Sequence, residues 1–146
     1  MYEFLLRSLA QKQWARIGIQ RRAGVSAPLF SIYSKKSVGI GDLRDLKLLM
    51  DWCSSVGMSI LELLPMNDVG FGFRPYDAQS SFALEPMYLV LDHLIGIKPG
   101  VYSSDLKGLR RQFPPGSRWV DYGIKQEKLN LLWNVFQAWS RGARSG

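Results

Sequence analysis

The stretch PMNDVGFGFRPY, residues 65–76, places polar, aromatic and conformationally restricted residues within twelve positions. Asn67 and Asp68 supply an amide and a carboxylate, and the aromatic side chains supply flat apolar faces. Pro75 restricts the backbone immediately before Tyr76. Such a combination suits a sugar, whose C–H faces lie on aromatic rings while its hydroxyls take hydrogen bonds. The alternative is an aromatic plug over a hydrophobic core, and composition alone favours the plug.

The twelve acidic residues contain no pair that spacing assigns to acid–base catalysis. Asp42 and Asp45 have the spacing of helix-capping residues. Glu62 interrupts an apolar run and points either into a cleft or into solvent, and the pattern leaves both alternatives open. Asp68 and Asp77 flank the aromatic stretch, where a carboxylate binds turn backbone or a polar ligand. No catalytic residue is therefore predicted from spacing.

Metal and phosphate chemistry have no support in the sequence. Cys53 is the single cysteine and His93 the single histidine, so a His/Cys metal site lacks ligands. GIGD, residues 39–42, lacks both the Gly-Lys-Ser/Thr ending of a phosphate loop and the three glycines of a dinucleotide site. We expect this stretch to be a tight turn that leads into a helix, and we expect no bound metal.

Composition narrows the class of protein. The 146 residues suit one modest domain or a piece of a larger one, and 47% of them are hydrophobic, enough for a core. The formal charge is +7, but the 19 Lys and Arg residues are scattered, so no nucleic-acid partner is expected. The sequence shows no signal peptide and no apolar run long enough for a membrane span. A cytoplasmic location is expected.

One β–α–β unit is the clearest prediction of local structure. Apolar residues recur with helical period over 43–56, Asp42 precedes them as an N-cap, and Gly57 provides a stop. A strand is predicted over 25–30 before this helix. The apolar run 58–64 after it is typical of a strand buried on both faces of a parallel sheet. The fold class is therefore α/β, with a right-handed crossover in a sheet or barrel.

Weaker patterns cover the rest of the chain. Residues 2–16 form a frayed helix or leader, 87–94 a further strand, and 98–117 a Pro/Gly/Ser-rich stretch. A helix is predicted over 126–139. Its apolar face comprises Leu129, Leu132, Trp133, Phe136 and Trp139. We expect too few strands for a self-sufficient α/β domain, and therefore expect the first part of a longer protein.

Four stretches occur in the order and spacing of a known family. They are RRAGVSAPLFSIYSKKSVGIGDL, DWCSSVGMSILELLPMND, RPYDAQSSFALEPMYLVL and VDYGIKQEKLNLLWNVF. In this order the chain resembles the 4-alpha-glucanotransferases (amylomaltases, or disproportionating enzymes) of glycoside hydrolase family 77. The resemblance covers about residues 14 to 139.

The resemblance implies the N-terminal portion of a (β/α)8 barrel, incomplete in this chain. Residues 1–18 would be a leader or helix, and residues 19–146 the first segment of the catalytic domain. The implied activity is transfer of part of a maltooligosaccharide or α-1,4-glucan to the 4-hydroxyl of an acceptor sugar, by the retaining two-carboxylate mechanism. No metal or organic cofactor is implied. The family's catalytic carboxylates lie on later strands, so this chain alone is expected to be inactive and to require the remainder of the barrel.

The same resemblance assigns substrate contacts to the aromatic stretch. Tyr76 would lie beside the sugar at the cleaved bond, where its ring stacks and favours the oxocarbenium-like transition state. Pro75, Asn67, Asp68 and Arg74 complete the predicted substrate-binding set.

Two positions depart from the family pattern. Arg74 replaces the serine of Ser-Pro-Tyr, and Glu85 replaces the asparagine of Asn-Pro. Arg74 either alters sugar affinity or pairs with Asp68, Asp77 or Glu85. The alternative function is a non-catalytic glucan-binding or protein-docking module that retains Tyr76.

Overall fold

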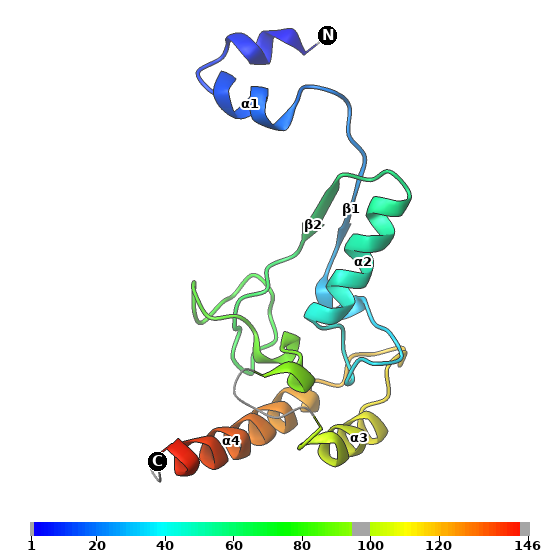
Figure 1. Cartoon of the computed structure of the whole chain (residues 1–146), viewed down its shortest axis with the longest axis vertical. Helices are drawn as coiled ribbons and strands as arrows, with labels where there is room; N and C mark the ends of the chain where they lie inside the picture. The colour runs from blue at the N-terminus through cyan, green and yellow to red at the C-terminus, as the bar shows by residue number, and fades with distance from the viewer. Residues whose placement is uncertain (1, 95–99, 144–146) are drawn as a thin grey trace.

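A parallel β–α–β unit lies between two helical regions (Figure 1). The computed structural model describes residues 2–94 and 100–143. In chain order its elements are η1 (Glu3–Arg7), α1 (Gln11–Ile17), β1 (Gly24–Ala27), η2 (Leu29–Ser31), α2 (Leu43–Ser55), β2 (Ile60–Leu63), η3 (Pro86–Tyr88), η4 (Leu91–His93), α3 (Ser103–Gln112) and α4 (Gly123–Ala143). This mixture of helices with a parallel strand pair confirms the α/β class.

The sheet is smaller and more exposed than the sequence predicts. β1 and β2 pair in parallel from Gly24↔Ile60 to Ala27↔Leu63. The first strand ends before Pro28, which has no N–H for the ladder and begins η2. Neither strand contains a buried residue, so the predicted burial on both faces is wrong for the described chain, because only two short strands with α2 alongside form this layer. Glu62 is exposed and faces solvent.

The N-terminus of α2 has the predicted capping box. The Asp42 carboxylate accepts hydrogen bonds from the backbone N–H groups of Arg44 and Asp45 at 2.8 and 3.3 Å. In return, Asp45 Oδ2 accepts from the Asp42 N–H at 3.0 Å and from Ser37 Oγ at 2.7 Å. Ser37, Asp42 and Asp45 are all buried. Burial, followed by the nearby charge of Asp45, raises the pKa of Asp42.

Asp42→Ala is expected to lower the free energy of unfolding by about 1–2 kcal/mol, because two N–H groups at the helix start lose their acceptor. Chemical denaturation followed by circular dichroism measures this. Asp51→Ala on the same helix removes only an exposed Lys47–Asp51 ion pair and should cost less than about 1 kcal/mol. Equal losses for the two variants would show that the cap does not stabilise α2.

The hydrophobic core lies beside the sheet rather than on it, between α3, α4, η3, η4 and the turn before α2. Its buried members are Leu29, Val38, Ile40, Met87, Tyr88, Leu91, Leu106, Leu109, Phe113, Ile124, Leu131 and Val135. The figure shows α3 and α4 together at the end of the molecule opposite η1 and α1 (Figure 1). The domain boundary at residue 18 stays a prediction.

The strand predicted over 87–94 is wrong: this run contains the two short helical turns η3 and η4. Pro86 has no N–H, and Glu85 caps the turn by accepting from the Met87 N–H at 3.5 Å. The run is apolar because Met87, Tyr88 and Leu91 enter the core. Apolar character therefore reflected burial, not extended backbone.

Helix α3 was not predicted, and it lies inside the Pro/Gly/Ser-rich stretch. Leu106, Leu109 and Phe113 are buried at helical spacing. Gly100 precedes the helix, and Pro114 and Gly116 follow it. These residues dominate the composition of the stretch and conceal its apolar period.

Helix α4 is longer than the predicted helix and buries a different face. Ile124, Lys128, Leu131 and Val135 are buried. The aromatic part of the predicted face stays at the surface: Trp133, Phe136 and Trp139 are exposed, with neighbouring ring centroids 5.6 and 6.3 Å apart. Among the described residues, no helix has the length and apolar character needed to span a bilayer.

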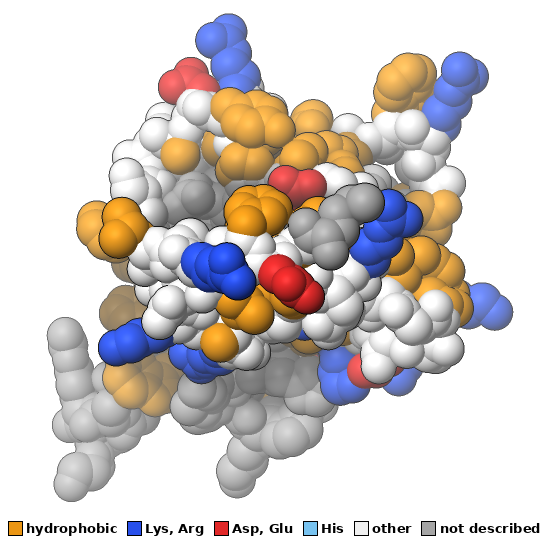
Figure 2. All heavy atoms as spheres, turned by 90° about the horizontal axis from the view of Figure 1, so that it is seen from above, with side chains coloured by type: hydrophobic (Ala, Val, Ile, Leu, Met, Phe, Trp, Pro, Cys, Tyr) orange, Lys and Arg blue, Asp and Glu red, His pale blue; other side chains and the backbone are white. Residues whose placement is uncertain are grey.

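Basic side chains are dispersed on the face seen from the N-terminal end. Figure 2 shows Lys and Arg separated there by apolar and neutral groups. This view agrees with the scattered basic residues of the sequence.

Candidate functional site

A closed loop follows β2 and contains the aromatic stretch. Its two legs are joined by backbone: the Asp68 N–H donates to the Ala83 carbonyl at 2.9 Å, and the Glu85 N–H donates to the Met66 carbonyl at 2.9 Å. Asn67 also forms an isolated bridge with Leu84. The two legs of the loop are therefore hydrogen-bonded to each other at the carboxyl end of β2, and the tip extends from them.

Lys125 of α4 binds both legs of this loop. Its Nζ donates to Asp68 Oδ1 at 2.7 Å, to the Gly70 carbonyl at 2.6 Å and to Glu85 Oε2 at 2.9 Å. We call these four residues the Lys125 clamp. The side chains of Lys125 and Glu85 are both 2% exposed. Charge-assisted bonds of this length, in a region with little water, fix the legs relative to α4.

The two carboxylates of the clamp have further donors. Asp68 Oδ1 accepts from the Gly70 N–H at 2.9 Å, and Glu85 Oε2 accepts from the Val69 N–H at 3.3 Å. The hydrogen bond from Lys125, and then the one from the Gly70 N–H, lower the pKa of Asp68. The buried charges are thus paired and hydrogen-bonded, the condition under which such burial is tolerated.

Aromatic rings pack around the same ammonium group. Lys125 Nζ lies 5.4 Å from the ring centroid of Phe71 and 5.9 Å from that of Phe73. Phe73 in turn stacks on Tyr122, with ring centroids 4.3 Å apart. The Phe73 backbone has φ of 52°, an uncommon conformation for a bulky residue. Stacking and cation–π contact hold it there.

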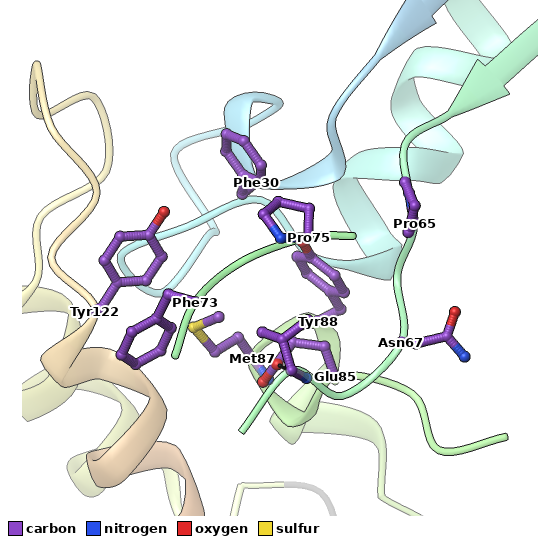
Figure 3. A pocket seen from close by; sticks show the side chains of 10 residues that line it. Phe30, Pro65, Asn67, Phe73, Pro75, Glu85, Met87, Tyr88 and Tyr122 are labelled. Carbon is purple, nitrogen blue, oxygen red and sulfur yellow. Dashed lines mark hydrogen bonds between the residues drawn. The ribbon is translucent and has the colours of Figure 1, made fainter. Parts of the chain in front are cut away.

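A small hollow opens beside these rings (Figure 3). Its cavity volume is about 20 Å³, room for about one water molecule. It is lined by Phe30, Pro65, Asn67, Val69, Phe73, Pro75, Glu85, Met87, Tyr88 and Tyr122. Figure 3 shows Tyr122 and Phe73 side by side on one side, and Asn67 on the other with its amide directed away from the rings. The hollow combines apolar rings with a few polar groups in its lining, but its volume is far below the usual range for small-molecule sites.

The phenol of Tyr88 stays protonated near neutral pH. Burial, followed by the charge of Glu85, raises the pKa of Tyr88 to about 12. A neutral phenol keeps its proton as a hydrogen-bond donor.

The five predicted site residues occupy different positions. Asn67 and Pro75 line the hollow, whereas Asp68 belongs to the Lys125 clamp. Tyr76 is 78% exposed and does not line the hollow. Arg74 is exposed, and its Nη1 lies 4.0 Å from Asp77 Oδ2. Their contacts with sugar stay predictions.

The structure distinguishes between the candidate ion-pair partners of Arg74. Of its three candidate partners, Asp77 is the one within ion-pair distance. Asp68 and Glu85 bind Lys125 instead. Glu85, the residue in place of asparagine, therefore has a buried cationic partner from α4.

Sequence reasoning missed Lys125 and Tyr122 as parts of this site. They lie 37 or more positions beyond the loop, so no local spacing connects them to it. One signal was available: Lys125 follows Ile124 at the start of the helix, next to the stripe that α4 buries. Within residues 2–94 and 100–143, no group of three His, Cys, Asp or Glu side chains is arranged to hold a metal ion.

The family model described as 4-alpha-glucanotransferase matches residues 27–145. This chain belongs to the 4-alpha-glucanotransferase family. Similar 4-alpha-glucanotransferases include proteins of Chlamydia pneumoniae, 45% identical over 84 residues, and Chlamydia trachomatis serovar D, 44% identical over 87 residues. These alignments cover 58% and 60% of this chain and 16% of each relative.

A 4-alpha-glucanotransferase of Oryza sativa subsp. japonica is 35% identical over 123 residues, covering 80% of this chain and 13% of the relative. The chain thus spans about one sixth or less of the length of these family members. No solved structure matches the chain significantly. Family membership therefore rests on sequence.

Proposed function

We propose that this chain forms the first part of a (β/α)8 4-alpha-glucanotransferase and contributes one wall of its α-glucan site. The observation that carries the proposal is the clamped aromatic loop at the carboxyl end of β2, in a chain of this family. In (β/α)8 enzymes, loops at the carboxyl ends of strands bind substrate. The parallel β1–α2–β2 unit is compatible with that architecture.

The loop's contribution is binding and orientation. Tyr76 projects from the tip with 78% of its surface exposed, so its ring is free to stack on a glucosyl unit. Pro75 restricts the preceding backbone, and the Lys125 clamp fixes the loop base. The retaining reaction needs a nucleophilic carboxylate and a proton-transferring carboxylic acid. We assign these two groups to the remainder of the barrel.

Titration of the chain with maltoheptaose, followed by NMR, tests this proposal. We expect saturable shifts at the aromatic loop, and weakening of about tenfold or more by Tyr76→Ala through loss of one stacking contact. Tyr33→Ala is the matched control, because Tyr33 is also exposed and does not line the hollow. A β-1,4-linked oligosaccharide of similar length tests specificity.

Two outcomes would contradict the proposal: no saturable binding of maltoheptaose, or equal weakening by the two tyrosine substitutions. With maltotriose, the isolated chain should produce neither glucose nor longer maltooligosaccharides. Appearance of those products would show that catalytic groups are present in this chain after all.

A further inference from the structure

A second hollow, which shares no lining residue with the first, is lined by five charged residues. Its cavity volume is about 350 Å³, open to solvent, and its lining residues are Lys35, Lys36, Arg44, Asp92 and Arg110. They come from the turn before α2, from α2, from η4 and from α3. Folding therefore brings four cationic side chains from three segments to one place.

Asp92 holds the two arginines in fixed positions. Its Oδ2 accepts from Arg44 Nη2 at 2.6 Å and from Arg110 Nη2 at 3.4 Å. Arg110 Nε also donates to the Lys36 carbonyl at 3.2 Å. The arginine side chains are 20% and 28% exposed. Two partly buried guanidinium groups are thus oriented before any ligand arrives, and each keeps further N–H donors.

Positive charge in the lining exceeds negative charge by three. Asp92 is the one carboxylate among the five residues. In the part of the chain that the structure describes, the ammonium groups of Lys35 and Lys36 have no hydrogen-bond or ion-pair partner. The hollow therefore attracts anions, and oriented guanidinium groups match the oxygens of phosphate.

We propose that this hollow binds the phosphate dianion, either as inorganic phosphate or as the phosphate group of a small monoester. The cations converge on one hollow instead of following a row, which disfavours a nucleic-acid backbone. The volume of about 350 Å³ lies at the lower end of the usual range for small-molecule sites. This site is separate from the aromatic loop: the two hollows share no lining residue.

Isothermal titration calorimetry on the whole chain, at constant ionic strength maintained with chloride, tests the proposal. The probes are inorganic phosphate and glucose 6-phosphate, representing the two sources of the dianion. We expect saturable binding of at least one probe, and tighter binding of the monoester if its sugar also contacts the hollow. Arg110→Gln should weaken binding about tenfold.

Arg111→Gln is the matched control, since it removes the same charge from the neighbouring position of α3 outside the lining. Lys36→Gln is a second test that preserves the Arg110–Asp92 contact, and it should weaken binding about threefold. Absence of saturable binding overturns the proposal. The proposal is also overturned if Arg110→Gln and Arg111→Gln have equal effects and Lys36→Gln has none. Tighter binding of duplex DNA than of either phosphate probe would overturn it as well.

Discussion

Lys125→Met is expected to lower the free energy of unfolding by about 3–5 kcal/mol, the usual cost of breaking a buried ion pair from one side. The substitution preserves an unbranched side chain but removes the three donors of the Lys125 clamp. Glu85, 2% exposed, would then keep a buried carboxylate without its cation, while Asp68 and the Gly70 carbonyl each lose a bond. Urea denaturation followed by circular dichroism measures the loss.

Lys125→Met should also change the packing of the aromatic loop. Phe73 stacks on Tyr122 and packs over the ammonium of Lys125, so its ring environment depends on the clamp. We expect Lys125→Met to reduce the near-ultraviolet circular dichroism of these rings. Weakened maltoheptaose binding should accompany this change if the proposed function is correct.

Two further variants distinguish the loss of the Lys125 clamp from the effect of removing any lysine charge. Lys107→Met removes an exposed lysine of α3 and should change stability by less than about 0.5 kcal/mol. Lys125→Met combined with Glu85→Gln removes both buried charges and should recover part of the loss. If Lys125→Met behaved like Lys107→Met, the clamp would not support the loop.

Gly41→Ala is expected to lower the free energy of unfolding by about 3 kcal/mol or more, the upper range for overpacking. A Cβ at residue 41 would lie 1.8 Å from the Ile32 carbonyl oxygen and 2.1 Å from that of Leu29. Both contacts are with backbone, which cannot rotate away as a flexible side chain can. The η2 turn or the segment leading into Asp42 would have to move, and this movement would disturb the capping box of α2.

Gly108→Ala provides the matched control, measured by the same urea denaturation. Its added Cβ would meet no atom within 4 Å, and the residue lies inside α3. Alanine should therefore raise the free energy of unfolding by about 0.5–1 kcal/mol through its helix propensity. A small loss for Gly41→Ala would mean that the turn before α2 accommodates the methyl group by a slight shift, contrary to the close packing described above.

The sequence by itself determined the features that depend on near neighbours. Asp42 and Asp45 lie three positions apart, so the capping box was predictable from helix geometry. The crossover from β1 through α2 to β2 followed from apolar period and from the stop at Gly57. Family membership could also be predicted from the sequence, because four stretches occur in the order typical of the family.

Tertiary structure alone decided the features that need distant partners. Lys125 reaches Asp68 across 57 positions and Glu85 across 40, and no periodicity encodes such a pairing. For the same reason the apolar run 87–94 resembles a strand in sequence, although burial of Met87 and Tyr88 against α4 requires no extended backbone. Local spacing determines backbone conformation and helix caps. The base of the loop between Asn67 and Glu85 is instead held by Lys125, which only folding brings near.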